Sequence, residues 1–229
     1  KICTLCGSVI NSISNVVLPR VTYLNNNASK DKSKKIMFKT LRYASVVAIA
    51  VTVGIICISD EFVPVFFGLG YEKSAVLLKI LAFNVLMSIL ANYIGQQCLI
   101  SNAKQNQYNI AISVGALLNV ILNFFMVERF QSVGVSVASV VSSGVLFWVV
   151  LMFSREIISL RNIIQMDWKA TIAAIIMFIT IYRLNFTHLF VTLAVKIAVG
   201  AVVYIAILVI LREETIQEVF VKIISKRRT

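Results

Sequence analysis

The sequence predicts an all-α bundle of helices that crosses a membrane several times. Hydrophobic residues make up 59% of the 229 residues and charged residues only 14%, whereas soluble domains carry about 25% charged residues. The mean hydropathy is +0.89. The charges gather between apolar runs of about 20 residues, the length that a spanning helix needs. A soluble fold of this size could not bury so much apolar surface.

The spans follow from the apolar runs in chain order. The first run, residues 2–18, lacks a basic leader and a small-residue cleavage site, so it predicts part of a helix and not a signal peptide. Because the chain starts at Lys1 without a methionine, we expect it to begin inside a helix of a longer protein. Six complete spans are then predicted, at residues 43–59, 75–101, 108–127, 133–153, 168–184 and 188–211.

Lysine and arginine residues alternate between rich and poor loops, and this bias predicts the orientation. One set of loops holds sixteen of them and the other set holds four, while Lys79 and Lys196 fall inside spans. Loops rich in lysine and arginine stay in the cytoplasm. We therefore predict a multi-pass protein of the cytoplasmic membrane whose C-terminus is cytoplasmic. The sixteen are Arg20, Lys30, Lys32, Lys34, Lys35, Lys39, Arg42, Lys104, Arg155, Arg161, Lys169, Arg212, Lys222, Lys226, Arg227 and Arg228.

The last segment, residues 212–229, has a different pattern. Apolar residues recur at helical spacing from Ile216 to Ile224, and four basic residues lie among and after them. This pattern is typical of an amphipathic helix on the anionic inner leaflet. A helix packed on the protein's own cytoplasmic loops is the alternative.

Several function classes are excluded by what the spans lack. The net charge of +12 would suggest nucleic acid in a soluble protein, but here the basic residues lie between spans, so we expect no nucleic-acid partner. The acidic residues, including Asp60 and Glu61, are expected in loops, and no span is expected to carry one. Glycine-rich phosphate loops, zinc-protease motifs and nucleophile elbows are absent from the sequence. We therefore expect no enzyme activity, no catalytic residue, no cofactor and no metal site; the pair Cys3 and Cys6 is interpreted as two buried apolar thiols.

Polar residues at membrane depth must find partners, so their placement is the best functional signal. In the span 75–101, Asn84, Ser88, Asn92 and Gln96 recur every four residues and share one helix face. The span 108–127 carries Asn119 and Asn123 with the same spacing. These six residues predict either one wall of a hydrated substrate cavity or hydrogen bonds between helices.

Lys196 lies eight residues into the last predicted span, about 12 Å from its outer end. A lysine inside the membrane is by default a functional candidate, and no carboxylate is expected within reach. A side chain that extends to the interface is the alternative, and for Lys79 that interfacial role is the preferred interpretation. Serines 132, 136, 139 and 143 form a small-residue stripe that favours close helix packing.

Several segments resemble the polysaccharide transporter family of lipid-linked oligosaccharide flippases (O-antigen type), within the multidrug/oligosaccharidyl-lipid/polysaccharide exporter superfamily. Leu18-Pro19-Arg20 before a basic loop is similar to a helix-ending motif of that family. Residues 66–75, Asn92, Lys104 before Tyr108, Asn119 with Asn123, and residues 134–139 follow in the family's order. The resemblance covers roughly residues 17–153. It departs at residues 128–134, where the family commonly has a proline.

The resemblance implies two pseudo-symmetric helical lobes, with this chain as a C-terminal part. Residues 1–153 would then form most of the second lobe, 154–211 an additional helix pair and 212–229 a cytoplasmic tail. The implied function is flipping of a polyprenyl-diphosphate-linked oligosaccharide repeat unit for surface polysaccharide biosynthesis, by alternating access. The implied partners are this lipid-linked substrate, membrane lipids and other membrane proteins of polysaccharide assembly.

Three other functions compete. A multidrug or cation extruder of the same superfamily would favour an acid inside the membrane. A membrane enzyme of polysaccharide assembly would need a substantial outer loop or an acid–histidine pair. A membrane scaffold without transport activity would not need the asparagine stripes.

Overall fold

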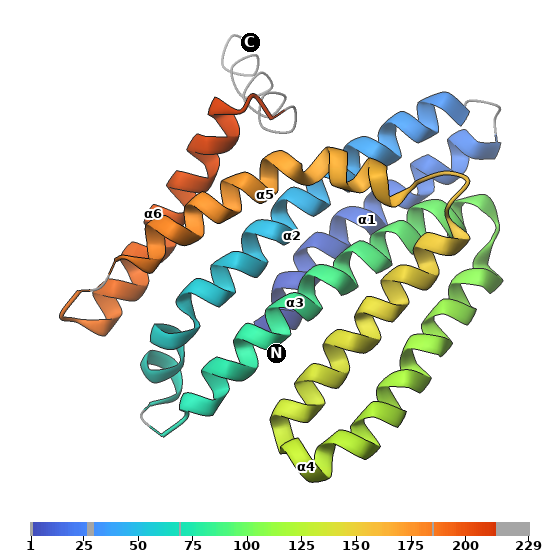
Figure 1. Ribbon diagram of the computed structural model, residues 1–229. Helices are drawn as coiled ribbons and strands as arrows, with labels where there is room; N and C mark the ends of the chain where they lie inside the picture. Colours follow the sequence, from blue (N-terminus) through green and yellow to red (C-terminus); the bar gives the residue numbers. More distant parts are fainter. Residues whose placement is uncertain (1, 27–29, 69, 185, 214–229) are drawn as a thin grey trace.

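The computed structural model describes residues 2–26, 30–68, 70–184 and 186–213, and these form a bundle of long antiparallel helices (Figure 1). The described residues contain no strand, which confirms the all-α fold class. The helices are α1 (Ile2–Asn26), α2 (Lys30–Phe67), α3 (Glu72–Ile94), α4 (Gln105–Phe153), α5 (Leu160–Tyr182) and α6 (Leu189–Ile210), with a π-helix η1 (Gly95–Leu99) and a 3-10 helix η2 (Ile100–Asn102) after α3.

Five of these helices are long and apolar enough to cross a membrane, namely α2, α3 with its continuation, α4, α5 and α6. The 49 residues of α4 make two crossings, because Gln131 has non-helical dihedral angles (φ 48°, ψ −132°) and the chain doubles back there. Figure 1 shows the two arms of α4 joined at the lower end of the bundle. The arms correspond to the predicted spans 108–127 and 133–153.

A glycine allows the α4 turn to close. A Cβ atom built on Gly134 would lie 2.5 Å from the carbonyl oxygen of Met126, which belongs to the other arm. No real Cβ atom approaches a backbone oxygen so closely, so only glycine fits at this position without moving the main chain. The turn that the sequence predicts between residues 127 and 133 is therefore present, with Gln131 at its bend.

Helix α2 is much longer than the predicted span 43–59, and this corrects two expectations. The basic residues from Lys30 to Arg42 are assigned above to a loop, but α2 begins at Lys30. Asp60 and Glu61 are expected above in a loop after the span, but α2 continues to Phe67, with Pro64 inside it. Hydropathy detects only the apolar middle of a helix, whereas main-chain hydrogen bonding continues through its charged ends. Asp60 and Glu61 are consequently helical residues.

Two further expectations concern the ends of the chain. Pro19 does not end α1, which runs on to Asn26. Of the predicted amphipathic tail, residues 214–229 lie outside the described residues.

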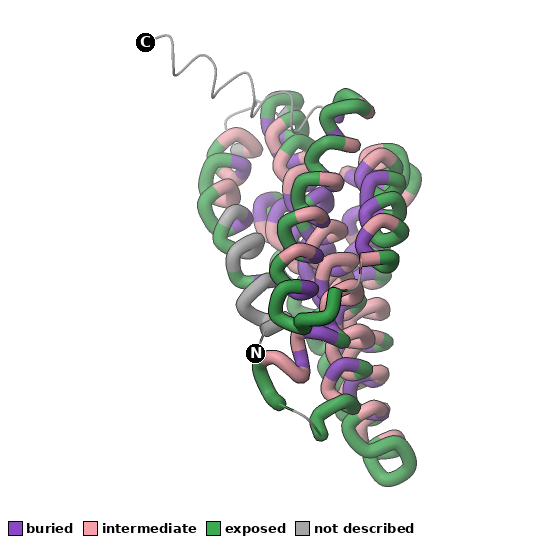
Figure 2. The backbone as a smooth tube through the Cα atoms, turned by 90° about the vertical axis from the view of Figure 1, so that its left-hand side faces the viewer, coloured by how far each residue is buried: buried purple, intermediate pink, exposed green. Residues whose placement is uncertain are grey.

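Buried residues gather where the helices face one another, and exposed residues line the outward faces (Figure 2). One apolar cluster joins α2, α3 and α4 and includes Leu41, Ile89 and Tyr93. A second joins α5 and α6 to Val46 of α2. Large apolar side chains elsewhere point outward, as expected for helices in lipid. Helix α2 therefore contacts α1 and α3 as well as α5 and α6, and α4 packs mainly on α3.

Candidate functional site

Two of the predicted asparagines join α3 to α4 through their side-chain oxygens. The hydroxyl of Ser143 donates a hydrogen bond to Asn84 Oδ1 at 2.6 Å, and the hydroxyl of Tyr108 donates one to Asn92 Oδ1 at 3.0 Å. Ser143 comes from the serine stripe, and Tyr108 begins the first arm of α4. Both asparagines are half-buried. Among the described residues, neither side-chain nitrogen donates a hydrogen bond, so each amide has a free donor.

Ser88 lies between these asparagines and has a local role. Its hydroxyl donates to the carbonyl oxygen of Val85 in the same helix, at 3.1 Å. A hydroxyl that bonds within its own helix needs no partner across the interface. The stripe predicted on α3 is thus present, with two of its members bound to α4.

At the end of α3 the polar face turns toward α1. The hydroxyl of Ser14 donates to Gln96 Oε1 at 2.8 Å, and Gln97 Nε2 donates to the hydroxyl and to the carbonyl oxygen of Ser14 at 3.1 and 3.0 Å. Gln97 is fully buried and was not predicted. The π-helix from Gly95 to Leu99 brings both glutamines to Ser14, because a π turn holds one more residue than an α turn.

Gly95 opens this π-helix at a point of close contact. A Cβ atom there would lie 2.1 Å from Cε2 of Tyr108. The tyrosine ring is buried against the glycine, and its hydroxyl bonds Asn92. The sequence offered one signal for this contact, namely a glycine in an otherwise apolar span.

Asn119 and Asn123 bond each other and not the α3 asparagines. Asn123 Nδ2 donates to Asn119 Oδ1 at 2.9 Å, and both side chains are half-buried on the first arm of α4. Asn123 Oδ1 is buried and accepts no hydrogen bond from the described residues. The structure therefore places the predicted amides in two groups, one on α3 and one on α4.

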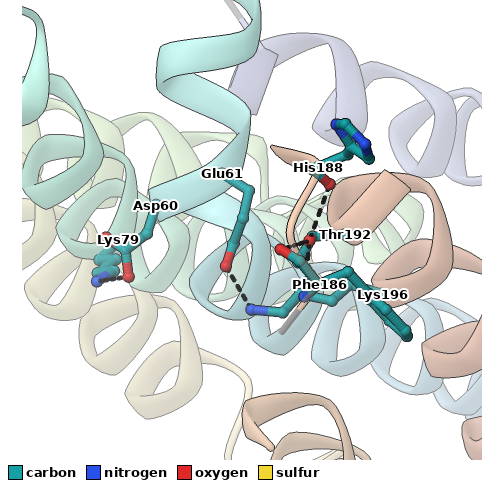
Figure 3. Close-up of polar contacts among 7 residues, drawn as sticks. All are labelled: Asp60, Glu61, Lys79, Phe186, His188, Thr192 and Lys196. Carbon is teal, nitrogen blue, oxygen red and sulfur yellow. Dashed lines mark hydrogen bonds and ion pairs between the residues drawn. The ribbon is translucent and has the colours of Figure 1, made fainter. Parts of the chain in front are cut away.

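Lys196 forms a buried ion pair, which corrects the expectation that no carboxylate is within its reach. Its Nζ lies 2.5 Å from Oε1 of Glu61, and the side chains of the lysine and the glutamate are only 6% and 11% exposed. Figure 3 shows the two side chains pointing toward one another from α6 and α2. A lysine that reaches the interface would have an exposed ammonium group, so the buried pair disagrees with the interfacial alternative.

The neighbouring carboxylate of α2 binds the other predicted membrane lysine. Lys79 Nζ lies 2.7 Å from Oδ2 of Asp60, and these side chains are 37% and 64% exposed. In Figure 3 this pair lies on the opposite side of α2 from Glu61 and Lys196. The exposure of Lys79 agrees with the interfacial role predicted for it. Two consecutive acidic residues thus bind two different helices, α3 and α6.

The loop before α6 is closed by Thr192. Its hydroxyl accepts a hydrogen bond from the N–H of Phe186 and lies 3.1 and 3.2 Å from the carbonyl oxygens of His188 and Phe186 (Figure 3). His188 is the residue that precedes the first turn of α6. The single histidine therefore stands at the boundary of α6, whose predicted span begins at residue 188.

A second charged group lies at the other end of α2, α5 and α6. Arg42 Nε is 2.5 Å from Glu213 Oε1, and the glutamate is fully buried. Asp167 is also buried, within α5. The prediction that no span carries an acidic residue is therefore wrong for Glu61 and Asp167. Helix α5 begins at Leu160, two turns before the predicted span, and so includes the aspartate.

Two apolar grooves run beside α2. One, of about 780 Å³, lies between α2, α3 and α5, and the other, of about 760 Å³, lies between α2, α5 and α6. Lys196 lines the second groove, whereas none of the six predicted hydroxyl and amide residues lines either one. The described residues hold no group of three histidine, cysteine, aspartate or glutamate side chains that could bind a metal.

Comparisons with known proteins agree with this architecture. A family model described as "Lipid II flippase MurJ" matches residues 3–221. The solved structure of a lipid II flippase MurJ in an inward closed conformation is similar, with a TM-score of 0.78 and 19% identity over 93% of this chain. The alignment covers 45% of that protein, so the chain spans less than half of its length. A comparison with curated proteins gives no match.

Proposed function

Since the chain belongs to the lipid II flippase MurJ family, we propose that it is the C-terminal part of a transporter that moves a lipid-linked saccharide precursor across the cytoplasmic membrane. The observation that carries the proposal is the family match along nearly the whole helical bundle. The substrate would be held by its polyprenyl diphosphate and headgroup, and two lobes would expose it to each side in turn.

The headgroup is the finer question. The family description favours lipid II, the lipid-linked precursor of peptidoglycan, as the first candidate. The motif resemblance described above favours an oligosaccharide repeat unit of O-antigen type as the second. Both are polyprenyl diphosphates, so the apolar and anionic parts of the substrate are the same.

The free amide donors of α3 support a polar path for the headgroup. Asn84 and Asn92 use their oxygens to bind α4, and their nitrogens remain available to a sugar hydroxyl. In this proposal the same side chains serve both of the roles that the sequence leaves open, helix pairing through the oxygen and substrate binding through the nitrogen.

Transport by the full-length protein in liposomes tests the function. Fluorescent lipid II and a polyprenyl-diphosphate-linked oligosaccharide are supplied separately, and the fraction that reaches the other leaflet is measured with an impermeant quencher. Transport of lipid II alone supports the first substrate, and transport of the oligosaccharide alone supports the second. If correctly folded protein moves both substrates no faster than they move in liposomes without protein, the proposal is contradicted.

A cysteine scan tests the polar path. Single cysteines at 84, 88 and 92 are compared with cysteines at 86 and 90, whose leucines line the apolar groove beside α5, after replacement of the four native cysteines. We expect a water-soluble thiol reagent to modify the first set and not the second, and added substrate to slow the reaction. Equal protection of all five positions would mean that the stripe only joins helices.

The same reagent tests the orientation that we propose. Figure 1 shows the C-terminal ends of α1, η2 and α4 at one end of the bundle and those of α2 and α5 at the other. Cysteines at Glu72 and Arg129 should react on intact cells, and a cysteine at Lys104 should react only after permeabilisation. The reverse pattern would place the C-terminus outside the cytoplasm.

A further inference from the structure

We infer that two reciprocal ion pairs, Glu61–Lys196 and Arg42–Glu213, fix the direction and register of α6 on α2 and so position the α5–α6 helix pair. The first pair has an Nζ–Oε1 distance of 2.5 Å and the second an Nε–Oε1 distance of 2.5 Å. This attachment goes beyond the transport function and does not depend on which substrate is carried.

The two pairs are far apart along α2. Arg42 and Glu61 are nineteen residues apart on α2, which is about 28 Å at the α-helical rise per residue. The hydrocarbon core of a bilayer is about 30 Å thick. Helix α6 and the residue that follows it are therefore joined to α2 at two points that are separated by nearly this thickness.

The order of the charges selects one arrangement. From the inner to the outer end, α2 presents a cation and then an anion, whereas α6 and the residues after it present Glu213 and then Lys196. If α6 ran in the same direction as α2, Arg42 would face Lys196 and Glu61 would face Glu213. Like charges would then meet at both ends, so the pattern disfavours the wrong orientation as well as stabilising the right one.

The helix end is shaped to deliver Glu213 to this contact. Arg212 adopts a left-handed conformation (φ 49°), the N–H of Glu213 donates to the carbonyl oxygen of Leu208, and that of Arg212 donates to Val209. These are the two hydrogen bonds of a Schellman motif, which reverses the chain direction after a helix. Lys169 of α5 donates to the carbonyl oxygen of Arg212 at 3.2 Å and links the third helix to the same turn.

The apolar packing in the region between the two ion pairs is incomplete, so the ion pairs contribute more to the position of α6 on α2. A groove of about 760 Å³ lies between α2, α5 and α6, and Gly54 of α2 and Ala201 of α6 both line it. The polar contact that crosses the interface here is the hydrogen bond from the Tyr204 hydroxyl to the carbonyl oxygen of Val46, at 2.8 Å. In lipid, apolar side chains gain little by leaving the solvent, so polar contacts and close packing determine helix association.

Spin-label distances in the full-length protein test the inference. Labels are placed on Gly54→Cys and Ala201→Cys in a background without native cysteines; a Cβ on Gly54 meets no atom within 4 Å, so the label fits. We expect a narrow distance distribution in the parent. Glu61→Gln and Lys196→Met should broaden it and lower the amount of folded protein about tenfold or more, because each leaves one buried charge without a partner.

Two double variants separate register from stability. The exchange Glu61→Lys with Lys196→Glu should restore both the narrow distribution and the amount of protein. The neutral pair Glu61→Gln with Lys196→Met should restore the amount, since no charge is left buried, but not the narrow distribution. Because Asp60 forms an exposed ion pair on the same helix, Asp60→Asn is the matched control and should change neither quantity.

A narrow distribution in the neutral double variant, or a broad one in the charge exchange, would overturn the inference. If the single variants do not accumulate, the two double variants still decide it. A broadening in Asp60→Asn equal to that in Glu61→Gln would also count against it, because any lost carboxylate would then have the same effect.

Discussion

The two sides of α2 are held by different interactions. Toward α3 and α4, the contacts are a large apolar cluster and, between α3 and α4 themselves, neutral hydrogen bonds such as Tyr108–Asn92. Toward α6, the apolar cluster is smaller, and two buried ion pairs join the helices. The ion pair on the α3 side, Asp60–Lys79, is exposed, whereas the pairs that join α2 to α6 and to the residue after it are buried. The difference teaches that a large apolar contact is accompanied by neutral hydrogen bonds and an exposed ion pair, and a small one by buried ion pairs.

Glycine substitutions should give the largest contrast between the two sides. Gly95→Ala places a Cβ atom 2.1 Å from the ring of Tyr108, which is buried and hydrogen-bonded. Gly200→Ala places one 2.6 Å from Cδ1 of Ile181, the end of a flexible side chain. We expect Gly95→Ala to cost about 3 kcal/mol and Gly200→Ala about 1 kcal/mol, measured by thermal unfolding in detergent. Equal losses would mean that both sides are packed alike.

The two partners of the neutral hydrogen bond between α3 and α4 should depend on each other: losing one should destabilise the protein more than losing both. Asn92→Leu leaves the Tyr108 hydroxyl buried without an acceptor, so it should cost about 1–3 kcal/mol. Adding Tyr108→Phe should recover most of the loss, because both polar groups are then gone. The unfolding free energies of the two single variants and the double variant form the measurement. A double variant as unstable as the sum of the singles would show that the two residues act separately.

Left-handed helix ends occur on both sides and offer a stabilising change. Ala103 after η2 and Arg212 after α6 have φ values of 59° and 49°, where glycine is favoured. Ala103→Gly and Arg212→Gly should each raise the unfolding free energy by about 1 kcal/mol. The hydrogen bond from Lys169 survives Arg212→Gly, because its acceptor is a main-chain oxygen. A loss of stability in Arg212→Gly would assign a role to the arginine side chain.

The smallest effect concerns an exposed ion pair on the α4 side. The Lys104 side chain donates a hydrogen bond to Glu156, and with its charge this lowers the pKa of the glutamate below the ordinary 4.5. A lowered pKa means that the pair stabilises the fold above the ordinary value, and that this is lost as the pH falls through the pKa of the folded protein. Between pH 7 and pH 3 the unfolding free energy should therefore decrease slightly less in Lys104→Met than in the parent protein. Identical pH profiles would show that the pair contributes nothing.

Most of the fold can be predicted from the sequence because two separate signals mark each membrane helix. Apolar length and loop charge place six crossings, including the turn at Gln131 that divides α4. The candidate site is predicted less well. Glu61 is missed because hydropathy ends the span at the first charged residues, although α2 continues through them. Its partner Lys196 is identified, but the contact joins residues 135 positions apart and depends on how the helices pack.

The π-helix after Ile94 changes how α3 can be described. Up to that residue, the polar side chains repeat every four positions and face α4; after it, Gln96 and Gln97 face Ser14 of α1. The polar side chains of α3 and those of the π-helix η1 therefore point in different directions around the helix. The extra residue of the π turn sets the angle between these two directions, which is the offset. Deleting one residue from Gly95–Leu99 would remove the offset and rotate the residues that follow it by about 100°. The glutamines would then leave α1 while Asn84 and Asn92 stayed in place.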